Sequence, residues 1–96
     1  MNYSILHNLF GAYLNQDYDL ICESDTIEGA LDYYVAESPS ETLKALSDEI
    51  EDFCLKNSDK LDESFSVTFQ PEVDIGNTRE FFSLLIDKAR ASGKLA

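Results

Sequence analysis

Four segments of this chain carry apolar residues at helical spacing, and this periodicity is the strongest constraint on its fold. The segments run over residues 2–14, 25–37 and 38–56, and from residue 77 onward. In each of them, large apolar side chains recur three and four positions apart, which gives a helix one face to bury. We therefore expect a mainly α fold, built as a compact bundle of about four helices.

Three of these segments open with a helix-start signal. The quartets Asp-Thr-Ile-Glu at 25–28, Ser-Pro-Ser-Glu at 38–41 and Asn-Thr-Arg-Glu at 77–80 each place a side-chain acceptor three residues before a glutamate. Such an acceptor binds the unpaired amides of the first helical turn. We predict that the first residue of each quartet is the N-cap of its helix.

Residues 65–69 depart from the helical pattern. Here Phe65, Val67 and Phe69 alternate with polar residues, which is the period of a strand. We expect an extended segment, because the alternation puts three apolar side chains on one face. It either pairs as a strand with residues 19–22 or lies as a loop on the helical core, since a lone strand needs a partner.

The length and charge of the chain limit its class. Its 96 residues fit one domain, spanning residues 1–96. The formal net charge is −12, from 19 acidic and 7 basic side chains. Nucleic acid and anionic membranes would repel such a chain, since both need clustered lysine or arginine. The charge either favours a cationic partner or serves solubility alone.

The chain shows no targeting signal and no membrane segment. No N-terminal stretch combines a basic region with an apolar one, and no apolar run approaches the roughly 18 residues of a membrane span. We expect a cytoplasmic protein.

The acidic side chains are distributed unevenly along the chain. The first 43 residues contain no lysine or arginine, so we expect an uncompensated negative surface there. The eight acids of this part are Asp17, Asp19, Glu23, Asp25, Glu28, Asp32, Glu37 and Glu41.

The residue patterns of catalysis and redox chemistry are missing. His7 is the only histidine and has no nucleophile or acid at catalytic spacing. Cys22 and Cys54 are isolated, which favours buried thiols over a metal or redox pair. We expect no enzyme activity and no cofactor.

Asp17, Asp19 and Glu28 occupy positions 1, 3 and 12 of an EF-hand register, as in a calcium loop. The match fails at Ile21, where an oxygen ligand is needed, and at Cys22, where the turn requires glycine. We expect no metal site.

The sequence Phe-Gly-Ala-Tyr-Leu-Asn-Gln-Asp-Tyr at residues 10–18 resembles a known family signature. Small helical immunity proteins of bacterial contact-dependent growth inhibition carry Phe-Gly-Ala-Tyr-Phe-His-Gln-Asp-Trp near the N-terminus. Leu14, Asn15 and Tyr18 replace Phe, His and Trp, and the other positions match.

The resemblance implies a function in toxin neutralisation. Members of this family are cytosolic antidotes that bind the toxic C-terminal domain of a contact-delivered effector, often a nuclease. For this chain it implies a cognate toxin domain as the partner, basic and nuclease-like, whose active site or substrate groove is blocked. The acidic charge agrees with this, because carboxylates can imitate nucleic-acid phosphates. The alternative is a generic acidic interaction module, such as a nucleic-acid mimic or adaptor.

The resemblance also divides the residues by role. A motif common to antidotes that face different toxins is expected to hold the fold, which assigns a structural role to Phe10, Gly11, Tyr13, Gln16, Asp17 and Tyr18. We predict toxin contact in the acidic run that follows, extended by Asp48 and Asp52. The predicted binding residues are Asp19, Glu23, Asp25, Glu28, Asp32 and Tyr33.

Overall fold

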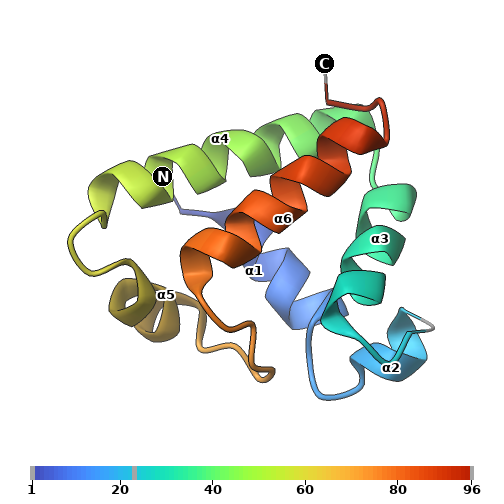
Figure 1. The fold of residues 1–96 in the computed structure, drawn as a ribbon, viewed down its shortest axis with the longest axis horizontal. Helices are drawn as coiled ribbons and strands as arrows, with labels where there is room; N and C mark the ends of the chain where they lie inside the picture. Colours follow the sequence, from blue (N-terminus) through green and yellow to red (C-terminus); the bar gives the residue numbers. More distant parts are fainter. Residues whose placement is uncertain (1, 23, 96) are drawn as a thin grey trace.

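The computed structural model describes residues 2–22 and 24–95, which form six α-helices, one π-helical turn and no strand. The predicted mainly α class is confirmed, and each of the four expected helical segments is present. The elements are α1 (Ser4–Asn8), the π-helical turn η1 (Leu9–Tyr13), α2 (Tyr18–Ile21), α3 (Ile27–Glu37), α4 (Ser40–Lys56), α5 (Leu61–Phe69) and α6 (Thr78–Ala91) (Figure 1).

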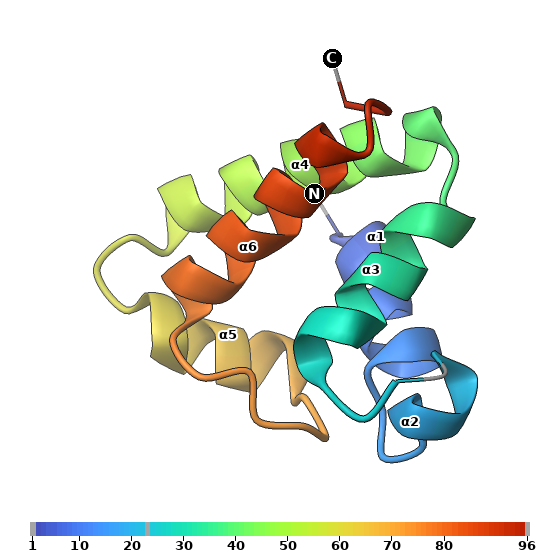
Figure 2. The same cartoon turned by 45° about the vertical axis from the view of Figure 1, so that its right-hand side comes forward.

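The long helices α4 and α6 lie side by side, with α3 and α5 at opposite ends of the molecule (Figures 1 and 2). Helix α6 contacts α3, α4 and α5, and α1 packs against α4. Since α6 touches three of the other helices, the last element of the chain completes the core.

All six phenylalanines meet in the centre of this arrangement. The ring of Phe10 lies 5.1 Å from Phe65, 5.6 Å from Phe69 and 5.7 Å from Phe81. Aromatic pairs at these separations add to the free energy gained by burial. The cluster therefore ties the start of the chain to α5 and α6.

The prediction of an extended segment at residues 65–69 is wrong, because these residues belong to α5. Leu61, Phe65 and Phe69 are spaced four apart and all three are buried, whereas Val67 is 71% exposed. The apparent alternation arises because Val67 points to solvent between two core residues. The helical spacing that begins at Leu61 decides the structure.

One predicted N-cap is confirmed and one is displaced by a residue. Asn77 caps α6, and its side-chain oxygen accepts a hydrogen bond from the Glu80 amide at 3.0 Å. In α3 the cap is Thr26 instead of Asp25, because the Thr26 hydroxyl accepts from the Gly29 amide at 3.0 Å.

The third predicted cap serves a different helix. Ser38 is buried and ends α3, where its hydroxyl donates to the Tyr34 carbonyl at 2.7 Å. Pro39 is the N-cap of α4 and provides no side-chain acceptor. The prediction of Ser38 as the N-cap of α4 is therefore wrong, because the Ser38 hydroxyl is bonded to the last turn of α3 instead.

A buried glutamate of α4 holds the N-terminus of α1. Glu49 is only 7% exposed, and its carboxylate accepts hydrogen bonds from the amides of Ile5 at 3.1 Å and Leu6 at 3.0 Å. The amides of a first helical turn have no partner within the helix, so an anionic acceptor is favourable there. One turn further along α4, Asp52 accepts from the Tyr3 hydroxyl at 2.7 Å.

We predict that Glu49→Ala lowers the free energy of unfolding by about 2–4 kcal/mol, because two amides in a buried setting lose a charged acceptor. The measurement is urea denaturation of both proteins. Asp48→Ala is the control, because Asp48 is the exposed neighbour on the same helix and should change stability by less than about 0.5 kcal/mol. Equal unfolding midpoints for the two variants would contradict the assignment.

Helix α6 is tied to α5 by a second carboxylate. Asp62 accepts a hydrogen bond from the Thr78 amide at 2.8 Å, and Thr78 is 2% exposed. Hydrogen bonding from Thr78 lowers the pKa of the Asp62 carboxyl below its ordinary value of 3.8. The ionised form is therefore the one that the fold favours.

This lowered pKa predicts a pH dependence of stability. The unfolded chain takes up the proton at the ordinary pKa, whereas the folded chain holds Asp62 ionised to lower pH. The contribution is complete above about pH 5, where the unfolded chain is ionised as well, and is lost as the pH falls through the folded pKa. Between about pH 6 and pH 2, the melting temperature should fall less steeply with decreasing pH for Asp62→Asn than for the wild type. Asp59→Asn, at an exposed loop position, should keep the wild-type slope.

Candidate functional site

The acidic run predicted to bind the partner folds into the corner formed by α2 and the N-terminal half of α3 (Figures 1 and 2). Asp19 lies on α2, Asp25 precedes α3, and Glu28 and Asp32 lie one turn apart on α3; all four are exposed. Tyr33 is half-buried and packs against the core, 6.4 Å from the ring of Tyr13. Glu23 lies outside the described residues.

A lysine from the far end of the chain partly neutralises this corner. The Lys88 ammonium of α6 lies 2.7 Å from a carboxylate oxygen of Asp32 and 3.4 Å from one of Glu28. The Lys88 side chain is only 14% exposed. The hydrogen bond that its ammonium donates to Asp32, followed by the charge of Asp32 and by Glu28, raises the pKa of the lysine. The uncompensated surface predicted from the first 43 residues is therefore only partly present.

A second lysine holds the other end of α3. The Lys94 ammonium donates to the carbonyl oxygens of Val35 and Ala36 at 2.9 Å and of Ser38 at 2.8 Å. These carbonyls carry the negative end of the helix dipole, where a cation is favourable. The chain after residue 87 thus contacts both ends of the helix that bears Glu28 and Asp32.

We predict that Lys88→Met destabilises the fold by about 1 kcal/mol, because it leaves two carboxylates without their cation. Lys44→Met is the matched control, since Lys44 is exposed and forms no ion pair in the part of the chain that the structure describes. Thermal melts at low salt should give a lower melting temperature for Lys88→Met than for Lys44→Met, and added salt should reduce this difference. A Lys88 variant as stable as the Lys44 variant at low salt would contradict an ion-pair role.

The remaining acids of the corner lack such compensation. Asp17, Asp19 and Asp25 are exposed, and none of them forms an ion pair within residues 2–22 and 24–95. Asp19 accepts a hydrogen bond from the Leu20 amide at 3.0 Å, and the Leu20 side chain is 78% exposed. Within the corner, the acids that have no ion pair therefore lie at α2 and directly before α3.

The two residues predicted to extend the surface along α4, Asp48 and Asp52, differ in exposure. Asp48 is exposed. Asp52 is half-buried, accepts from the Tyr3 hydroxyl and pairs with Lys56 at 3.3 Å. The hydrogen bond from Tyr3 lowers the pKa of Asp52, and burial raises the pKa of Tyr3 to about 12. Asp52 thus already takes part in the contact between α1 and α4.

The aromatic members of the 10–18 signature point into the fold. Phe10 lies in the phenylalanine cluster, and the Tyr13 ring meets Tyr34 edge-on at 4.9 Å. The Tyr18 hydroxyl donates to the Asp25 carbonyl at 3.2 Å, which links α2 to the start of α3. These three contacts shape the corner that carries the acids.

The polar members of the signature lie at the surface. Gly11, Gln16 and Asp17 are exposed, and a side-chain carbon added at Gly11 would meet nothing within 4 Å. Close packing of another backbone therefore does not require a glycine at this position. Asn15 organises the turn, because its amide donates to the Gly11 carbonyl and its oxygen accepts from the Asp17 amide, both at 2.9 Å.

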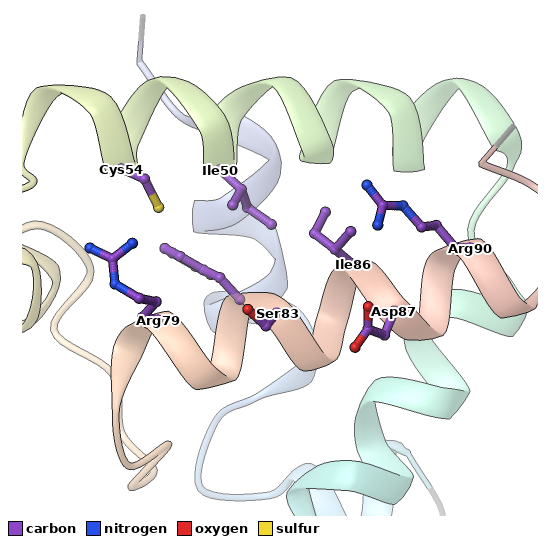
Figure 3. Close-up of a pocket in the computed structure, with 8 residues that line it drawn as sticks. Ile50, Cys54, Arg79, Ser83, Ile86, Asp87 and Arg90 are labelled. Atoms are coloured by element: carbon purple, nitrogen blue, oxygen red, sulfur yellow. The ribbon is translucent and has the colours of Figure 1, made fainter.

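A groove of about 230 Å³ runs between α4 and α6 (Figure 3). The two arginines of the chain, Arg79 and Arg90, lie at the two ends of the groove and point toward α4. Cys54 lies between the helices, and burial raises the pKa of its thiol. The sequence reasoning missed this groove. Its lining is Ile50, Cys54, Arg79, Phe82, Ser83, Ile86, Asp87 and Arg90.

Among the described residues, no three histidine, cysteine or acidic side chains come together as a metal site would require. None of the helices that the structure describes has the length and apolar character needed to cross a membrane.

A protein-family model matches most of the chain. The model of a protein family described as "CdiI immunity protein" matches residues 2–89, which include the signature, the acidic corner and most of α6. No curated protein and no solved structure matches the chain.

Proposed function

The chain belongs to the CdiI immunity protein family, and we propose that it binds and neutralises the toxic C-terminal domain of a contact-dependent growth inhibition effector. The family match over residues 2–89 carries this proposal. In this role the chain catalyses no reaction, and it acts in the cytoplasm, where the delivered toxin works.

The charge of the chain supports a basic, nuclease-like toxin as the partner. A net charge of −12 attracts a cationic protein and speeds its encounter. A surface that binds nucleic acid is rich in lysine and arginine, so exposed carboxylates can occupy the positions of phosphates on it. The chain would then block the active site or the substrate groove.

We propose the α2–α3 corner as the toxin-binding surface. Exposed acids from two elements meet there, and the aromatic residues of the signature fix the corner from inside. The signature residues thus keep their proposed structural role, while the toxin contacts the surface that they support. The proposed contact residues are Asp19, Glu23, Asp25, Glu28, Asp32 and Tyr33.

The first test is binding to the C-terminal toxin domain of a contact-dependent growth inhibition effector from the same genome, sought first in a reading frame next to that of this chain. We expect a complex with a dissociation constant on the order of nanomolar that weakens as salt is added, and loss of toxin activity in the complex. A chain that fails to bind this domain at low salt would contradict the proposal and favour a generic acidic adaptor.

The location of the surface is tested with charge-neutral substitutions. We predict that Asp19→Asn with Asp25→Asn weakens toxin binding about ten-fold or more and reduces its salt dependence, because both carboxylates are exposed and without an ion pair. Glu63→Gln with Glu72→Gln is the control, since it removes the same charge from exposed positions on α5 and the loop after it. Equal weakening by the two pairs would show that net charge matters and the corner does not.

A further inference from the structure

Leu20 is the most exposed of the large apolar side chains in the described residues, at 78%. Two other large apolar side chains in this part of the chain are exposed, Leu55 by 73% and Val67 by 71%. An exposed leucine alone is ordinary on a protein surface. Its meaning depends on how firmly it is held and on what surrounds it.

The backbone holds Leu20 in place. Its amide donates to the Asp17 carbonyl and to the Asp19 carboxylate, both at 3.0 Å. Directly after α2 the chain enters the core at Cys22, which is 3% exposed and whose amide donates to the Tyr18 carbonyl at 2.8 Å. Leu20 therefore lies on a short helix whose backbone is held by hydrogen bonds. Binding through this residue would order little additional chain.

The charges around the three exposed apolar residues differ. Leu20 follows Asp19 directly in α2, and both Asp19 and Asp17 are exposed without an ion pair in the described chain. Leu55 precedes Lys56, which is paired with an acid of its own helix. Val67 stands between two uncharged residues, Ser66 and Thr68.

The central part of a protein interface is apolar and is surrounded by a polar rim, and a few anchor residues in pockets supply most of the affinity. Leu20 with its neighbouring carboxylates has this composition, and a basic partner is complementary to it in charge. Glu28 and Asp32 are less available, because Lys88 already binds both.

We infer that Leu20 is the apolar anchor of the toxin interface. Its side chain enters an apolar pocket on the toxin domain, and lysine or arginine side chains at the rim of that pocket meet Asp17 and Asp19. This inference rests on the proposed function and moves the centre of the interface from α3 to α2.

The test measures binding of the toxin domain to the full chain carrying Leu20→Ala, Leu55→Ala or Val67→Ala. We expect Leu20→Ala to raise the dissociation constant about ten-fold or more, mainly through faster dissociation, while the other two variants stay within about two-fold of the wild type. Since Leu20→Ala removes no charge, the salt dependence of its binding should match that of the wild type. Equal melting temperatures of the three variants would show that the fold is kept.

Other outcomes overturn the inference in distinguishable ways. If the wild type binds the toxin and all three variants bind equally well, Leu20 is no anchor, but the proposed function stands. If Leu20→Ala changes the oligomeric state of the free chain, Leu20 belongs to a contact between copies of the chain. If the wild type itself does not bind the toxin domain, the proposed function fails together with the anchor.

Discussion

The two hydrogen bonds from the amides of Ile5 and Leu6 to the Glu49 carboxylate are the contact on which the N-terminal part of the structure depends. Helix α1 has five residues, too few for a stable helix without tertiary support. By supplying an anionic acceptor from α4, the fold fixes where α1 begins. The direction of the chain through η1 then brings Phe10 into the phenylalanine cluster.

The long helices are predictable from the sequence, because their apolar period and their approximate ends are local properties. The error at residues 65–69 shows the limit, since Phe65 and Phe69 fit an alternation as well as a helix, and Leu61 decides between them through tertiary packing. Glu49 lies three residues after Leu46 and four before Phe53, beside the apolar face of α4, but no local pattern gives it a partner. Its burial follows from the position of α1 against α4, which local patterns do not contain.

The candidate surface was predictable to the same extent. Exposure of Asp19, Asp25, Glu28 and Asp32 follows from their places outside the apolar faces, and the structure has all four exposed. Which of them remain available to a partner depends on Lys88, 56 residues beyond Asp32. By sequence, Lys88 is a basic residue in the last turn of a helix, where the helix dipole alone would account for it, whereas the fold turns it toward the acids.

The three hydrogen bonds from Lys94 to the end of α3 make the C-terminal tail part of the structural unit. The family match ends at residue 89, before this lysine. A truncated protein cut at the family boundary would keep every acid of the corner and yet lose the cation that closes the helix bearing two of them. An affinity tag or fusion partner at the C-terminal end therefore needs a linker that leaves the Lys94 contacts undisturbed.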